Sequence, residues 1–265
     1  MWVTRMRKRH SYEEYIKAME LLRQMGTRKA SRILGIPRST LINWRRGQKP
    51  WQAKWTPKPT KELAYILGTL MGDAYLVRDG SHYDIRLRVK DRDFAQFFSK
   101  LMSKVLGKKE NKVVFDTVRK MWYVKYGSKA FYTWYIKQNL ETLKYYIEHS
   151  RDCVKYFLRG LYDSEGSHIV TSNKSYTDQK INLYSSNVRL LKYVKSLLFN
   201  YFKIEASGPH INRRAGSKSV KYDGSIIVSR KDRYVLKISK RRHVKLFLKE
   251  IGFSIKRKQF PCKNE

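Results

Sequence analysis

Hydrophobic and polar residues alternate along the chain with two different periods, and each period predicts one type of element. Apolar residues recur at helical spacing in residues 11–46, in three short runs separated by Gly26 and Gly35. In residues 85–90, which read IRLRVK, aliphatic residues alternate strictly with cations, as in a strand with one buried face. The pattern therefore predicts both helices and sheets, with cations spaced regularly along at least one strand.

One order of elements occurs twice after residue 60. We expect a helix in 63–73, two strands joined by an Asp79-Gly80 turn, a helix in 94–106, strands in 112–118 and 121–127, and a helix in 128–149. A similar order follows from residue 157, with strands in 167–186, a helix from Asn187, strands in 204–212, 219–229 and 234–240, and a last helix near 240–250. The pattern predicts an α+β fold with an internal αββαββα duplication, in which residues 61–150 form the first repeat and 151–265 the second.

The first 60 residues differ from the rest in pattern and charge. Helix, short glycine turn and helix in residues 27–46 resemble the helix-turn-helix arrangement, whose last helix enters the major groove. The region contains 15 basic and 3 acidic residues. We expect residues 1–48 to form a small all-α DNA-binding domain with a basic N-terminal arm, and residues 49–60, with three prolines, to form a linker. A three-helix lid that does not touch DNA is the alternative. The residues that we place at DNA are Arg38, Ser39, Thr40, Asn43, Arg45 and Arg46.

Two apolar helical runs, at 63–74 and 157–167, share one spacing. Each contains two small residues four apart, followed directly by an acid: Gly68, Gly72 and Asp73 in the first run, Gly160, Ser164 and Glu165 in the second. Small residues at i and i+4 lie on one helix face and allow two helix backbones to approach closely. If these faces pack together, the two carboxylates come side by side at helix ends that already carry partial negative charge. Such a pair favours divalent metal ions with oxygen ligands.

The net charge limits the partners that the protein can have. Of the 265 residues, 58 are basic and 22 acidic, which gives a formal charge of +36, and 42% are hydrophobic. The hydrophobic fraction is enough to form a folded core, and the large positive charge indicates a polyanionic binding partner. No apolar run reaches the ~18 residues of a spanning helix, and no apolar stretch follows the basic N-terminus. We therefore expect nucleic acid rather than a membrane. Cys153 and Cys262 show no metal-binding spacing, which favours reduced thiols in an intracellular protein of the cytoplasm, the nucleoid or an organelle.

The two helical runs with paired small residues, ILGTLMGDA and LRGLYDSEG, resemble the two copies of the LAGLIDADG motif in single-chain homing endonucleases. The resemblance implies that the motif helices form the interface between two pseudo-symmetric αββαββα halves, whose sheets make a saddle-shaped DNA-binding surface. It also implies that the last acid of each motif, Asp73 or Glu165, binds the catalytic metals, two or three Mg²⁺ or Mn²⁺ ions shared with DNA phosphates. We include the next residues, Ala74 and Gly166, in the metal site; Ala74 replaces the closing glycine of the motif.

The family also implies a basic side chain near each scissile phosphate. Lys125 and Lys237 end equivalent strands, and we expect them to order water or to stabilise charge on the phosphate. Arg88 and Tyr184 hold the corresponding places in the preceding strands; the alternative for all four is a side chain on a solvated strand. Residues expected at DNA come from the alternating strands and from a basic loop in 213–222: Arg86, Arg88, Lys90, Tyr184, Arg213, Arg214 and Lys218.

These features predict a monomeric DNA endonuclease of the homing type that recognises a long asymmetric duplex. The resemblance implies metal-dependent cleavage of both strands across the minor groove, with short 3′ overhangs. Two alternatives stay open. One is an RNA splicing maturase that uses the same fold to hold intron RNA, and the other is a DNA-binding regulator whose core does not cleave.

Overall fold

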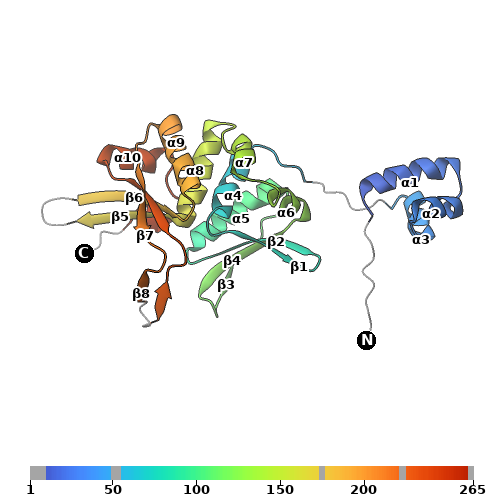
Figure 1. Ribbon diagram of the computed structural model, residues 1–265, viewed down its shortest axis with the longest axis horizontal. Coiled ribbons are helices and arrows are strands. Elements are labelled where there is room, and N and C mark those ends of the chain that lie inside the picture. Colours follow the sequence, from blue (N-terminus) through green and yellow to red (C-terminus); the bar gives the residue numbers. More distant parts are fainter. Residues whose placement is uncertain (1–9, 49–54, 173–176, 221–224, 262–265) are drawn as a thin grey trace. The chain divides into compact units, whose positions relative to one another are not determined.

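The computed structural model describes residues 10–48, 55–172, 177–220 and 225–261, and it divides into two compact units, residues 1–54 and 55–265. Figure 1 shows the elements of both units. Cys262, residues 221–222 of the expected basic loop and most of the basic N-terminal arm lie outside the described residues. None of the described helices is both long enough and apolar enough to span a membrane.

Three short helices form the first unit: α1 (Tyr12–Gln24), α2 (Thr27–Leu34) and α3 (Arg38–Arg45). A capping box begins α1, because the Ser11 hydroxyl accepts from Glu14 N and the Glu14 carboxylate accepts from Ser11 N. Gly35 ends α2 with φ at 63°, a left-handed conformation that favours glycine and turns the chain toward α3. The helices share one small core, formed by Tyr15, Ala18, Leu22, Ala30, Ile36, Leu41 and Trp44.

The second unit begins at Trp55, five residues before the expected end of the linker. The Trp55 indole donates to Val105 O at 2.6 Å and contacts the rings of Phe131 and Trp134. The first half of this unit then follows in order: α4 (Lys61–Leu70), β1 (Tyr75–Asp79), β2 (His82–Val89), α5 (Arg92–Leu106), β3 (Val114–Asp116), β4 (Met121–Gly127), α6 (Lys129–Tyr135) and α7 (Leu140–Ile147).

The single helix expected in 128–149 is wrong, because the chain forms α6 and α7 with a break between them. The Asn139 side chain accepts from Thr142 N, while Thr142 Oγ1 accepts from Asn139 N. This capping box satisfies amide groups that would otherwise be unpaired at the start of α7, so a new helix begins there.

The second half repeats the order with one addition. Its elements are α8 (Arg151–Glu165), β5 (Gly166–Ser172), β6 (Thr177–Ser185), α9 (Val188–Phe202), β7 (Ser207–Arg213), β8 (Lys218–Val220), β9 (Ile226–Val228), β10 (Arg233–Ile238), α10 (Arg241–Glu250) and α11 (Lys256–Gln259). The strand expected in 219–229 is wrong: its two ends pair with each other as the separate ribbon β8–β9. Three residue pairs lie opposite each other in this antiparallel ribbon, and neither strand joins the larger sheet.

Both halves build the same four-stranded antiparallel sheet, in the order β1-β2-β4-β3 in the first and β5-β6-β10-β7 in the second. The registers also correspond. Arg86 lies opposite Lys125 in the first sheet, and Asn182 lies opposite Lys237 in the second. Strand register thus confirms the predicted α+β duplication. A single hydrophobic core extends through both halves, and the helices α4 and α8 pack against each other within it.

Candidate catalytic site at the paired motif helices

The backbones of α4 and α8 touch at Gly68 and Gly160, the small residues of the two motif helices. A Cβ atom at Gly68 would lie 2.2 Å from Phe157 O, and one at Gly160 would lie 2.3 Å from Tyr65 O. Both distances are shorter than any contact that a real Cβ atom makes, so glycine is required at these positions. Small residues therefore determine how closely the two halves approach.

The same contact continues to the ends of the helices and brings the two acids together. A Cβ atom at Gly72 would lie 2.4 Å from Ser164 Cβ and 3.2 Å from Glu165 Cγ. Hydrogen bonds from Gly72 N and Ala74 N to Thr69 O continue the end of α4 up to Asp73. Ala74 and Gly166, the residues after the acids, are both buried. The predicted interface positions and the predicted acids thus lie in one place.

The electrostatics of Asp73 reflect this arrangement. Burial, followed by the nearby Glu165 carboxylate, raises the pKa of Asp73 from 3.8 to about 6. Asp91 also raises the pKa of Asp73, whereas Lys258 lowers it. Like charges held at the negative ends of two helices disfavour the ionised form. A cation bound here would relieve that cost.

The other acid of the second motif, Asp163, has a structural position that the sequence did not indicate. Its buried carboxylate accepts from the Tyr65 hydroxyl at 2.7 Å, from Ser254 N at 2.9 Å and from the Ser254 hydroxyl at 2.6 Å. Burial raises the pKa of Asp163, the hydrogen bonds from Ser254 and Tyr65 oppose this rise, and the net value is about 6. Asp163 therefore ties both motif helices to the C-terminal segment.

That C-terminal segment also brings cations to the acids. The Lys258 ammonium is buried and donates to Asp163 O and Tyr162 O at the end of α8, while Arg257 forms two hydrogen bonds with the Asp91 carboxylate. Burial lowers the pKa of Lys258, and the Asp163 and Asp73 carboxylates oppose this shift. A cavity of about 210 Å³ connects this segment with the first acid and is lined by Asp73, Arg88, Val89, Lys90, Asp91, Phe94, Met121, Asp163, Ser164, Arg257 and Lys258.

Glu165 has a different neighbour. Its carboxylate lies 3.5 Å from an Nη atom of Arg233, whose guanidinium also lies over the Tyr184 ring at 4.9 Å from the centroid. Tyr184 was expected at DNA, but Arg233 was not singled out. Arg233 is one of 58 basic residues, and nothing in the sequence around it distinguishes it from the others.

The predicted lysines lie on the exposed faces of the two sheets. Lys125 shares a row with Arg86 and Tyr75, and Lys237 shares the equivalent row with Asn182. Both lysines are exposed, whereas Asn182 is buried. Each row begins two residues after an acid, because Tyr75 follows Asp73 and Ser167, opposite Asn182, follows Glu165. No ion pair joins either lysine to either acid in the described part of the chain.

The other predicted cations of the first sheet take part in local pairs or line the cavity. Arg86 donates to the Asp84 carboxylate at 2.7 Å, and Arg88 lies 3.6 Å from the Asp116 carboxylate. Arg88 and the exposed Lys90 both line the cavity beside Asp73. The structure therefore groups Arg88 and Lys90 with the first acid, and leaves Arg86 held by its neighbour.

The remaining predicted positions lie outside this site. Arg213 and Lys218, expected in a loop, belong to β7 and β8, and Arg214 lies between these strands; all three are exposed. In the first unit α3 buries Leu41 and Trp44 and exposes most of the residues placed at DNA, with Thr40 half-buried. Arg38 also donates to Thr27 Oγ1 at 3.4 Å.

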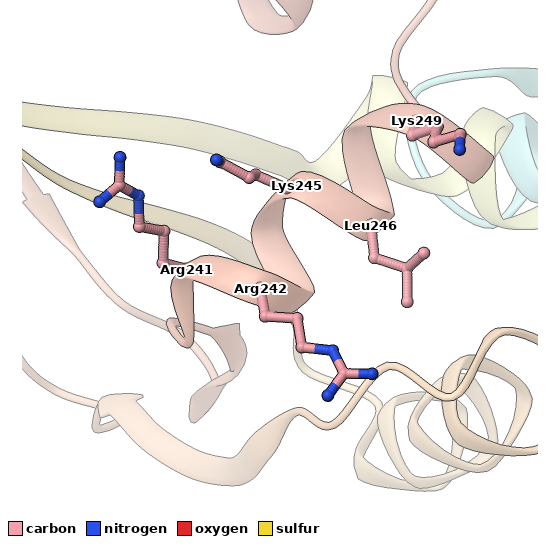
Figure 2. Close-up of a pocket in the computed structure, with 5 residues that line it drawn as sticks. All are labelled: Arg241, Arg242, Lys245, Leu246 and Lys249. Carbon is pink, nitrogen blue, oxygen red and sulfur yellow. The ribbon is translucent and has the colours of Figure 1, made fainter.

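A larger cavity of about 670 Å³ lies along α10 and has no lining residue in common with the cavity beside Asp73. Figure 2 shows its lining, in which the cationic side chains of Arg241, Arg242, Lys245 and Lys249 project from the helix with Leu246. It contains no acid and no nucleophile, so it is not a candidate for the catalytic centre.

Comparison with known proteins agrees with this geometry. A family model described as a LAGLIDADG-like domain matches residues 152–252. The uncharacterised protein MJ0398 of Methanocaldococcus jannaschii is 32% identical over 267 residues, which cover 97% of this chain and 89% of that protein. The chain belongs to the LAGLIDADG family. A second relative in the same organism, the uncharacterised protein MJ0314, is 32% identical over 142 residues, 53% of this chain and 54% of that protein.

Two solved structures resemble this LAGLIDADG protein. The structure of I-DmoI in complex with DNA and Mn matches 74% of this chain and 98% of that chain, with a TM-score of 0.49 and 20% sequence identity. The N-terminal LAGLIDADG domain of DUF199/WhiA matches 74% of this chain and 84% of that chain, with a TM-score of 0.45 and 16% identity.

Proposed function

We propose that this LAGLIDADG protein is a site-specific DNA endonuclease of the homing type, which cuts both strands of a long asymmetric duplex and leaves short 3′ overhangs. The observation that carries the proposal is the meeting of Asp73 and Glu165 at the ends of two helices in backbone contact. Exposed Lys125 and Lys237 lie on the adjoining sheets, in rows that begin two residues after each acid. Acids and cations arranged in this way fit phosphodiester hydrolysis better than simple binding.

The two acids fit divalent metal ions such as Mg²⁺ or Mn²⁺. Carboxylate oxygens are the ligands that these ions prefer, and a bound cation would offset the burial and the Glu165 charge that raise the pKa of Asp73. No group of three or more His, Cys, Asp and Glu that could hold a metal occurs in the described residues. Asp73 and Glu165, with the adjoining Ala74 and Gly166, would therefore share the ions with DNA phosphates. A bound metal supplies an activated water and positive charge at the phosphate.

The protein's own cations have separate tasks in this proposal. Lys125 and Lys237 orient water or stabilise the charge that develops on each scissile phosphate. Arg88 and Lys90 beside Asp73 and Arg233 beside Glu165 hold the DNA phosphates close to the acids. The exposed side chains of α3 would contact a further segment of the same duplex and lengthen the recognised site.

Cleavage of a selected site tests the proposal. Sites are selected from a random duplex library, cloned into a supercoiled plasmid and incubated with protein and Mg²⁺. We expect linear product that disappears in EDTA, and a loss of at least about 100-fold in rate in the Asp73→Asn and Glu165→Gln variants, with binding retained. The matched control is Lys245→Ala on α10, which changes a charge away from the acids. Cleavage that survives both acid substitutions would refute the mechanism.

A DNA-binding regulator without nuclease activity is the second candidate, and one observation favours it. Each acid already has a cation nearby, Arg233 at Glu165 and Lys258 close enough to lower the pKa of Asp73. If these cations replace the metal, Mg²⁺ will not raise the melting temperature of the protein and no selected site will be cut. A metal-dependent rise in melting temperature that is lost in Asp73→Asn excludes this candidate.

A further inference from the structure

The ribbon β8–β9 occurs in the second half alone. In the first half a short turn joins β3 directly to β4, whereas in the second half residues 214–232 separate β7 from β10 and contain the ribbon. The ribbon exposes its aliphatic side chains: Val220 is 72% exposed, Ile226 62%, Val228 50% and Ile227 43%. A ribbon that leaves its aliphatic side chains this exposed contributes little to the stability of the fold.

The strand register gathers most of these side chains on one face. Val220 lies opposite Ile226, and Lys218 lies opposite Val228, so these four side chains share a face. Ser219 and Ile227 occupy the other face, where an Nη atom of Arg213 donates to Ser219 Oγ at 3.3 Å. The first face is therefore an unpartnered aliphatic surface with one lysine at its edge. Unpaired apolar surface on an exposed ribbon normally marks a binding surface.

The charge around the ribbon indicates the partner. Between residues 213 and 233 the chain has seven basic and two acidic residues. Arg213, Arg214, Arg230 and Arg233 are exposed at the base of the ribbon. The acid Asp232 is engaged there, because it accepts from Ala215 N at 2.8 Å. A surface of aliphatic groups rimmed by guanidinium groups fits a partner with apolar groups between rows of phosphates.

The position of the ribbon fits duplex DNA. Figure 1 shows β8 on the side of the second sheet opposite to α9 and α10. Lys237 alternates along β10 with Leu236 and Ile238, which lie in the core, so the exposed Lys237 belongs to the face turned away from these helices. The major groove of DNA is wide enough for a two-stranded β-ribbon, and the 5-methyl groups of thymine are the apolar groups that it presents. The minor groove of undeformed B-DNA is too narrow for a two-stranded ribbon.

We propose that β8–β9 enters the major groove in the part of the target bound by the second half, and that Val220, Ile226 and Val228 contact the 5-methyl groups of thymines there. This inference rests on the proposed function, since it assumes that the exposed face of the sheets binds duplex DNA. The ribbon thus reads thymine by apolar contact, and the arginines at its base hold the flanking phosphates. The ribbon thus gives the second half a preference for thymine that the first half lacks.

Replacing thymine by uracil tests the inference, because deoxyuridine keeps every hydrogen bond and removes only the methyl group. The full chain carrying Asp73→Asn is used to select bound duplexes, and each thymine of the selected site is then replaced singly. We expect at least one position, on the side bound by the second half, at which uracil weakens binding about fourfold, the effect of losing one buried methyl group. The variant Val220→Ser/Ile226→Ser/Val228→Ser removes the methyl groups of this face and should bind thymine and uracil duplexes equally at that position.

The matched control is Lys245→Ala on α10, which should keep the full discrimination against uracil. Selected sites without thymine on that side, or uracil effects that are unchanged in the serine variant, would overturn the inference. A variant that binds weakly while uracil has no effect would indicate a wedge between base pairs instead, and would also overturn it. These are binding measurements, so failure of the nuclease proposal shows separately, as absence of cleavage by the unmodified chain.

Discussion

Replacing Asp73 by Asn should stabilise the folded protein while it abolishes cleavage. The pKa of Asp73 is raised to about 6, mainly by burial and then by the charge of Glu165, so the folded state holds the ionised carboxylate poorly. Asparagine has nearly the same shape and no charge. The substitution removes the repulsion from Glu165 and the cost of burying a charge at the helix ends. An acid that is retained at such a cost in stability has a functional reason to be there.

The sign and size of this change in stability follow from the pKa of Asp73. In the unfolded chain the carboxyl titrates near 3.8, so between about pH 4 and pH 6 the folded state binds the extra proton. The destabilisation is absent below pH 4, grows as the pH rises, and is complete above about pH 6. A rise from 3.8 to about 6 corresponds to about 3 kcal/mol. Because Asp73 is partly exposed, screening by water reduces the expected gain of Asp73→Asn at pH 8 to about 1–2 kcal/mol.

Hydrogen exchange of amides in α4 and α8 measures this gain, since it reports the opening of the second unit separately from the first. We expect slower exchange in Asp73→Asn than in the unmodified chain at pH 8 without metal, and no difference near pH 4. Asp163→Asn is the matched control. It should destabilise the unit by about 1–3 kcal/mol, because its carboxylate accepts three hydrogen bonds. A pH-independent difference, or faster exchange in Asp73→Asn, would refute the reasoning.

Three further predictions follow from the same geometry. Gly68→Ala should lower the free energy of unfolding, measured by urea denaturation, by about 2–3 kcal/mol and reduce cleavage, because the added methyl would meet Phe157 O at 2.2 Å. Gly127→Ala is the control: its nearest contact would be at 3.7 Å, so the free energy of unfolding should change little. Lys125→Met should slow single-turnover cleavage about 100-fold with nearly unchanged binding in a gel-shift assay; equal rates would remove the lysine from the site. Deleting residues 1–54 should weaken binding and flatten its salt dependence in fluorescence titrations, without changing the rate of cleavage by the bound protein.

Local spacing was sufficient to predict the framework of the site. The positions of Gly68 and Gly160 could be read because a helix places residues four apart on one face, whatever the rest of the chain does. The alternation in 85–90 gave the buried face of β2 for the same reason. A capping box at Asn139 was also readable, and it would have divided the helix expected in 128–149.

Long-range packing was not predictable from local pattern. Lys258 reaches the end of α8 from a segment about 95 positions away, and Arg233 reaches Glu165 from β10. Nothing in their immediate sequence distinguishes either residue in a chain with 58 basic side chains. The ribbon β8–β9 was missed although the sequence carries Asp-Gly at 223–224, the turn signal that predicted the hairpin at Asp79-Gly80.

The two halves share a backbone plan but not a chemical environment. The shared fold places Asp73 and Glu165 close together, because the contact between α4 and α8 determines both how the halves pack and how close the two acids lie. The side chains around the acids then differ: a buried lysine, Asp91 and a cavity lie by Asp73, while Arg233 stacked on Tyr184 lies by Glu165. The added ribbon extends this difference to the outer edge of the second sheet. A duplicated chain can diverge in this way, whereas a symmetric dimer cannot, since each change would appear in both halves. In the function that we propose, this asymmetry would suit a pseudo-symmetric scaffold to a target whose two sides differ.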